Sequence, residues 1–224
     1  MDVKFPFPDE ETSRPLLEQD PEYRKIPPAE VENVFRRAWQ TGVDAAEQLL
    51  KQEPERPLDF FAISQKNGIQ IISSEKDNVA ANTRYYSEFY PKDKKIYLYN
   101  GSIRLWCAAN RLSLANGRML ILSHEFFHYL ESTTLGWTSK QYEVPMARIG
   151  SLTLGKTGCP SLSEIAANAF AFTCFPHLLI DEAAEIIPEE VLKPADSGEP
   201  KKKITFWNQR REELREVYNQ FFKL

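Results

Sequence analysis

One five-residue motif constrains this chain more than any other feature, because its two histidines need a specific local structure to act together. The motif is His124-Glu125-Phe126-Phe127-His128, an H-E-x-x-H pattern, and the chain has only one other histidine. In a helix, residues four apart lie on the same face, so both imidazoles can reach one metal ion while Glu125 projects beside them. We therefore predict a helix over residues 112–132 that carries the motif.

The residue types of the motif point to hydrolytic zinc chemistry. Neutral imidazoles are common zinc ligands, and zinc lowers the pKa of a bound water to about 7. A carboxylate such as Glu125 can take the proton as that water attacks a carbonyl carbon. The alternative, two core histidines without a shared partner, is costly because it buries two polar rings. The motif predicts His124 and His128 as zinc ligands, Glu125 as general base, and hydrolysis of a peptide bond.

A catalytic zinc site usually has three protein ligands, so the motif lacks one. Glu164 is the first candidate, because small residues on its predicted helix would allow a close approach to the motif helix. However, Ser161 and Glu164 also match the S-x-x-E capping box, in which the glutamate bonds to its own helix start. His177 is a second candidate, and Cys159 lies in a nearby loop. Spacing alone leaves the third ligand open among these residues and other acidic side chains.

Two segments taken together resemble the ImmA/IrrE family of bacterial metallopeptidases. They are the H-E-x-x-H motif and Glu164-Ile165-Ala166-Ala167-Asn168-Ala169-Phe170-Ala171, which is similar to the family's E-x-x-A-N-x-F-A. The order of predicted elements over roughly residues 58–180 is also similar. The bulky Phe126 and Phe127 depart from the family pattern, which often has a small residue before the second histidine.

The resemblance implies a zincin-like fold and a zinc ion held by His124, His128 and Glu164. It also implies proteolysis of a protein or peptide substrate, with a separate transcriptional repressor as the candidate partner. Two other functions stay open on the residues alone. One is a non-catalytic, zinc-containing protein-binding module, and the other is a zinc hydrolase that acts on a non-peptide amide.

Composition excludes several classes of protein. The chain is 42% hydrophobic and 27% charged, which is typical of a globular domain. We expect a cytoplasmic protein, because no apolar run approaches the roughly 20 residues of a membrane span and the N-terminus lacks a secretory pattern. A net charge of −4 gives no footprint for direct nucleic-acid binding. Three cysteines without a C-x-x-C pair argue against disulfides. The oligomeric state stays open.

We predict an α+β fold in which a small three-stranded sheet packs on helices and the motif lies on a central helix. Residues 1–27 are expected to form an extended or partly disordered arm, which either packs on the surface or covers the cleft as a latch. Residues 28–187 form the metallopeptidase domain, and residues 188–224 a polar loop and a C-terminal helix packed on it.

Periodicity and turn residues give the individual elements. Residues 131–160 are predicted to be a long connection, in which Tyr142 is one possible donor to the oxyanion. The predicted strands cover residues 69–72, 83–89 and 95–99. The predicted helices cover residues 28–51, 57–66, 102–110, 112–132, 161–175, 178–187 and 206–222.

Overall fold

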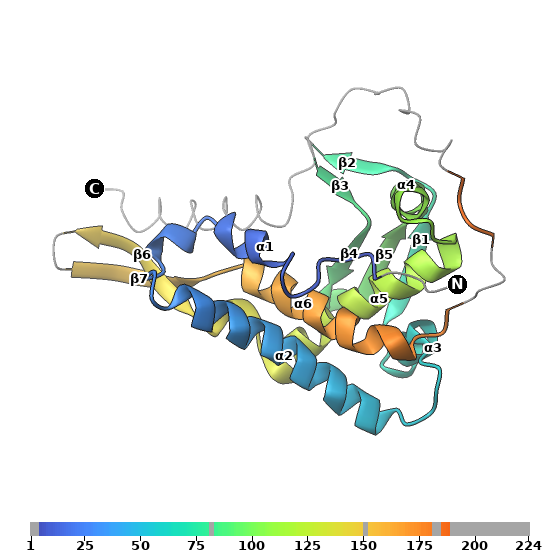
Figure 1. The fold of residues 1–224 in the computed structure, drawn as a ribbon, viewed down its shortest axis with the longest axis horizontal. Helices are drawn as coiled ribbons and strands as arrows, with labels where there is room; N and C mark the ends of the chain where they lie inside the picture. The colour runs from blue at the N-terminus through green and yellow to red at the C-terminus, as the bar shows by residue number, and fades with distance from the viewer. Residues whose placement is uncertain (1–4, 81–82, 150–151, 181–184, 189–224) are drawn as a thin grey trace.

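The computed structural model describes residues 5–80, 83–149, 152–180 and 185–188 (Figure 1). They form an α+β fold, which confirms the predicted class. The helices are α1 (Arg14–Glu18), α2 (Val31–Gln52), α3 (Phe60–Lys66), α4 (Asn100–Asn110), α5 (Leu114–Leu130) and α6 (Ser161–Cys174). The strands are β1 (Gln70–Ser74), β2 (Asn78–Ala80), β3 (Thr83–Tyr85), β4 (Ser87–Tyr90), β5 (Lys95–Tyr99), β6 (Glu143–Ile149) and β7 (Leu152–Gly158).

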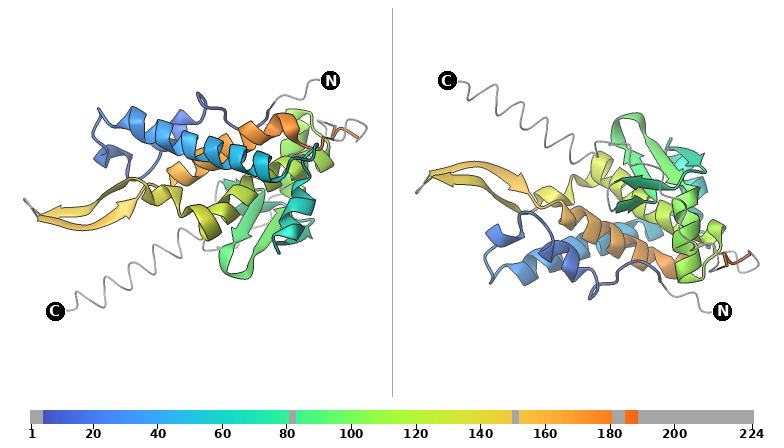
Figure 2. Two further views of the ribbon diagram at one scale, coloured as in Figure 1. Left: turned by 90° about the horizontal axis from the view of Figure 1, so that it is seen from below. Right: turned by 90° about the horizontal axis from the view of Figure 1, so that it is seen from above.

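The helices α2, α6 and α5 lie side by side, and the three-stranded sheet lies on the other side of α5 (Figures 1 and 2). Close approach between α2 and α6 depends on Gly42. A Cβ atom at this position would lie 2.0 Å from the carbonyl oxygen of Ala166 and 2.8 Å from the Cβ of Ala169. The small residues of α6 therefore serve its packing against α2 as well as against α5.

The three-stranded sheet has the order β1-β5-β4, with β1 parallel and β4 antiparallel to β5. Ile96 and Leu98 of β5 are completely buried in the main core. The predicted strand over 83–89 is wrong as a single element, because the chain changes pairing partner at Tyr86. β3 pairs with the unpredicted β2, whereas β4 joins β5 and forms an edge of the sheet. A continuous aromatic pattern cannot show such a change of partner.

The predicted long connection over 131–160 is also wrong. Residues 131–135 extend α5 as a π-helix, and β6 and β7 pair as an antiparallel hairpin with Glu143 opposite Gly158. The hairpin extends away from the rest of the molecule in every view (Figures 1 and 2). Pro145 and Gly155 resemble chain breakers in sequence, but a two-stranded hairpin tolerates both since each of its strands has an open edge.

The helix predicted over 178–187 is absent from the residues described there. Leu178 instead bridges to Leu58, and Ile186 bridges to Ser113. The predicted C-terminal helix over 206–222 lies outside the described residues. None of the described helices combines the length and the hydropathy that crossing a bilayer requires.

The N-terminal segment is folded onto the helices from residue 5 onward. It contains α1 and a short 3₁₀-helix at Tyr23–Lys25. Leu17 and Ile26 are buried in a second core with residues of α2 and α6. The carboxylate of Asp20 accepts a hydrogen bond from the backbone N–H of Ser161, at the first residue of α6 (2.9 Å). The predicted extended arm therefore includes a structural cap for α6.

Candidate metal centre

The motif helix α5 is a core helix, as its sequence predicts. Ser113 caps its start by accepting a hydrogen bond from the backbone N–H of Asn116 (3.1 Å). Phe126 and Phe127 are buried, and their rings contact those of Phe60 and Phe170. The two bulky residues thus fix α5 in the core, while the histidines project from another face of the helix.

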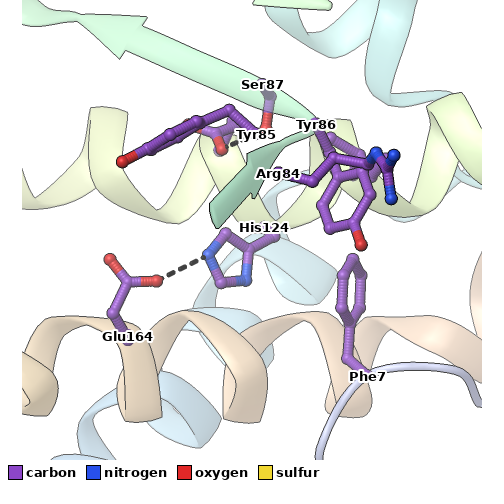
Figure 3. A pocket seen from close by; sticks show the side chains of 9 residues that line it. Phe7, Arg84, Tyr85, Tyr86, Ser87, His124 and Glu164 are labelled. Atoms are coloured by element: carbon purple, nitrogen blue, oxygen red, sulfur yellow. Dashed lines mark hydrogen bonds and ion pairs between the residues drawn. The ribbon is translucent and has the colours of Figure 1, made fainter. Parts of the chain in front are cut away.

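His124, His128 and Glu164 come together between α5 and α6. The Nε2 atom of His124 lies 3.3 Å from Oε2 of Glu164 (Figure 3). The Nε2 atom of His128 lies 3.6 Å from Oε1 of the same carboxylate. One ligand atom from each residue lies within 4.8 Å of the other two. Tetrahedral metal bonds of about 2.0–2.2 Å place neighbouring ligand atoms roughly 3.3–3.6 Å apart. The three side chains can therefore hold one divalent cation between them.

Glu164 does not form the capping box that its sequence permits. The N-cap residue of α6 is Pro160, which makes no side-chain cap, and the backbone N–H of Ser161 donates to the carboxylate of Asp20 instead. The Glu164 carboxylate projects toward α5, and its side chain is 50% exposed. It is therefore available as a ligand.

The other candidate residues lie elsewhere. His177 is exposed in the 3₁₀-helix after α6 and does not belong to the described metal-ligating group. Cys159 is buried in the second core, and burial raises the pKa of its thiol to about 12. The hydroxyl of Tyr142 donates to Glu30 (2.7 Å), so it is engaged between α2 and the hairpin. None of the three is brought to the histidines.

Glu131 is a site residue that the sequence analysis missed. One of its carboxylate oxygens lies 2.9 Å from Nδ1 of His128. The other accepts from the hydroxyl of Ser163 on α6 and from the backbone N–H of Thr138, each at 2.8 Å. With Nδ1 as the donor, Nε2 of His128 is left as a ligand, which is how metal-bound histidines are usually oriented. Glu131 follows His128 by three residues, so both lie on one face of a helix, and this spacing was the sequence signal that could have identified it.

The local charges favour a cation at the centre. Burial by itself would lower the pKa of His128, but Glu164, Glu131 and Glu125 outweigh it and raise the pKa. Burial would raise the pKa of Glu164, but the two imidazoles outweigh it and lower the pKa. The site thus attracts positive charge, either as protons on imidazole or as a metal ion.

Glu125 lies beside this group and is 8% exposed. Its Oε1 accepts a hydrogen bond of 2.5 Å from the hydroxyl of Ser87, the first residue of β4 (Figure 3). A cavity of about 250 Å³ opens here. Its lining residues come from the N-terminal segment, the β3–β4 region, α5 and α6: Phe7, Arg84, Tyr85, Tyr86, Ser87, Ile121, His124, Glu125 and Glu164. No local sequence pattern indicated that the lining residues that precede Ile121 in the chain belong to this site.

Glu131→Gln should weaken metal binding by about 10- to 100-fold, because the amide no longer stabilises the orientation and basicity of His128 as a carboxylate does. The metal dissociation constant can be measured by competition with a chromophoric chelator. Glu143→Gln, on the exposed hairpin, is the matched control and should bind metal like the wild type. Equal affinities in the two variants would show that Glu131 does not support the site.

Comparisons with known proteins give this chain no relatives. No family model, no curated protein and no solved structure matches it.

Proposed function

We propose that this chain is a zinc-dependent metallopeptidase with a zincin-like fold, as its resemblance to the ImmA/IrrE family implies. The observation that carries the proposal is the convergence of His124, His128 and Glu164 from two helices, with Glu125 beside them. Two imidazoles and one carboxylate form a donor set that is common in catalytic zinc sites. A purely structural site would need a fourth protein ligand, and neither Cys159 nor His177 belongs to the described group.

Each side chain has a role in this proposal. Zinc would supply the polarisation of the substrate carbonyl and the lowered pKa of water. Ser87 holds one oxygen of the Glu125 carboxylate. The other oxygen would take the proton of the attacking water and pass it to the leaving amine. Glu131 would keep His128 in the tautomer and orientation that present Nε2.

The position of β4 supports a peptide as the substrate. It forms an edge of the three-stranded sheet and packs beside α5. An edge strand has backbone N–H and C=O groups that an extended peptide can pair with. Such a peptide would pass Ser87 and Glu125 at the start of the strand. A transcriptional repressor, the substrate that the family resemblance implies, would present this kind of segment in a loop or linker.

Cleavage of a mixed peptide library tests the proposal. The zinc-loaded protein should cut a subset of peptides, and mass spectrometry of the products gives the bonds cleaved. Dialysis against a chelator should abolish the cleavage, and equimolar zinc should restore the same product pattern. Cleavage that persists after the metal is removed would contradict a zinc mechanism.

A further inference from the structure

Phe7 connects the N-terminal segment to the proposed active site. It lines the same cavity as His124, Glu125 and Glu164. Its ring centroid lies 5.5 Å from that of His124 and 5.1 Å from that of Trp106, on which it stacks. Figure 3 shows Phe7 and Tyr86 facing each other from opposite sides of the cavity, away from Glu164.

The segment is held on both sides of Phe7. Before it, the ring of Phe5 packs edge-on against Phe172 and Phe175, with centroid distances of 5.1 and 5.3 Å. After it, the hydroxyl of Ser13 donates to the carbonyl of Pro8 (3.2 Å), and Leu17 is buried. Contacts of this kind fix the position of Phe7, as is required of a wall of a binding site.

Phe7, Ile121 of α5 and the ring of the half-buried Tyr86 contribute apolar surface to the lining of the cavity. Arg84 also lines the cavity, but its guanidinium forms two hydrogen bonds to Asp77, at 2.8 and 3.1 Å, so its charge is compensated. A cavity of about 250 Å³ is smaller than the roughly 300–1,000 Å³ of small-molecule pockets. Its size suits one or two side chains of a bound peptide.

We propose that Phe7 is a specificity-determining residue of this site. With Tyr86 and Ile121, it forms an apolar wall that selects peptides with a large apolar side chain next to the scissile bond. The inference rests on the proposed function, because the selected side chain belongs to the peptide that Glu125 would help to hydrolyse. It assigns the N-terminal segment a role in substrate binding rather than in surface packing or blocking.

Binding of two hydroxamates to the zinc-loaded protein tests this proposal without relying on turnover. Phenylalanine hydroxamate and glycine hydroxamate share the metal-binding group and differ only in the side chain. Calorimetry on the wild type should show a preference of about tenfold for the phenylalanine compound, from burial of its ring. Phe7→Ala should reduce the preference to about threefold or less. Phe61→Ala, which removes the same side chain from α3 and away from the residues that line the cavity, should keep it.

The outcomes separate this inference from the proposed function. An unchanged preference in Phe7→Ala, with about one zinc per chain, would overturn the inference alone. A Phe7→Ala variant that binds both hydroxamates more tightly by the same factor would also overturn it, because Phe7 would then block the site. Failure of the zinc-loaded wild type to bind either hydroxamate would overturn both. Phe7→Trp, which retains an aromatic ring, should shift the preference toward the glycine compound.

Discussion

Glu125→Gln should reduce peptide hydrolysis by about 10²- to 10⁴-fold, the usual contribution of a general base, while zinc stays bound. The amide can still accept a hydrogen bond from Ser87, so the side chain should keep its place. It cannot take a proton from water at neutral pH. Because Glu125 lies beside the ligand group rather than in it, metal affinity should change little.

The experiment compares initial rates of cleavage for wild type and Glu125→Gln at equal zinc content, determined by elemental mass spectrometry. Glu143→Gln, an exposed glutamate on the hairpin, controls for the loss of one negative charge and should have wild-type activity. A fully zinc-loaded Glu125→Gln variant that cleaves at the wild-type rate would exclude Glu125 as the base. If neither protein cleaves any peptide, the alternative of a zinc-containing binding module gains support.

Glu164→Ala should weaken zinc binding by more than about a hundredfold. Loss of an outer partner of a ligand already costs about 10- to 100-fold, and Glu164 would be a ligand itself. Its two carboxylate oxygens lie 3.3 Å from Nε2 of His124 and 3.6 Å from Nε2 of His128. Removing the carboxylate leaves the two imidazoles as the remaining ligands of the proposed set. The variant should still fold, because the Glu164 side chain is half exposed and caps no helix.

Competition with a chromophoric chelator gives the zinc dissociation constant, and circular dichroism checks the fold. The matched control is His177→Ala, which removes the third histidine of the chain and should bind zinc like the wild type. The reverse result, in which His177→Ala loses zinc and Glu164→Ala retains it, would assign the third ligand to His177. A similar loss in both variants would point to a general effect on α6 rather than to loss of a ligand.

The sequence predicts the part of the site that lies within one helix. The four-residue spacing of His124 and His128 is a local feature, and the structure has a helix where this spacing predicts one. The third ligand is a tertiary contact. Spacing left Glu164 open because its capping box is equally compatible with the sequence. The structure resolves that conflict through Asp20, which caps α6 from a segment far away in the chain.

The residues that were missed are those that act over long sequence distances. Phe7 reaches the cavity only because the N-terminal segment folds along α6, and Ser87 only because β4 packs beside α5. Glu131 is close to the motif in sequence, but its role depends on contacts with Ser163 and Thr138 as well as with His128. The sequence analysis did not predict the hairpin β6–β7, because its glycines and proline resemble loop signals. Pairing between two strands also produces no hydrophobic periodicity within the sequence of either strand.

Anomalous diffraction at the zinc absorption edge, from crystals of the zinc-loaded protein, tests the central claim most directly. We expect one strong peak between α5 and α6, at about 2.0–2.2 Å from Nε2 of His124, Nε2 of His128 and a carboxylate oxygen of Glu164. A peak at another place, or none there in protein that contains stoichiometric zinc, would contradict the assignment of these three residues as the metal centre.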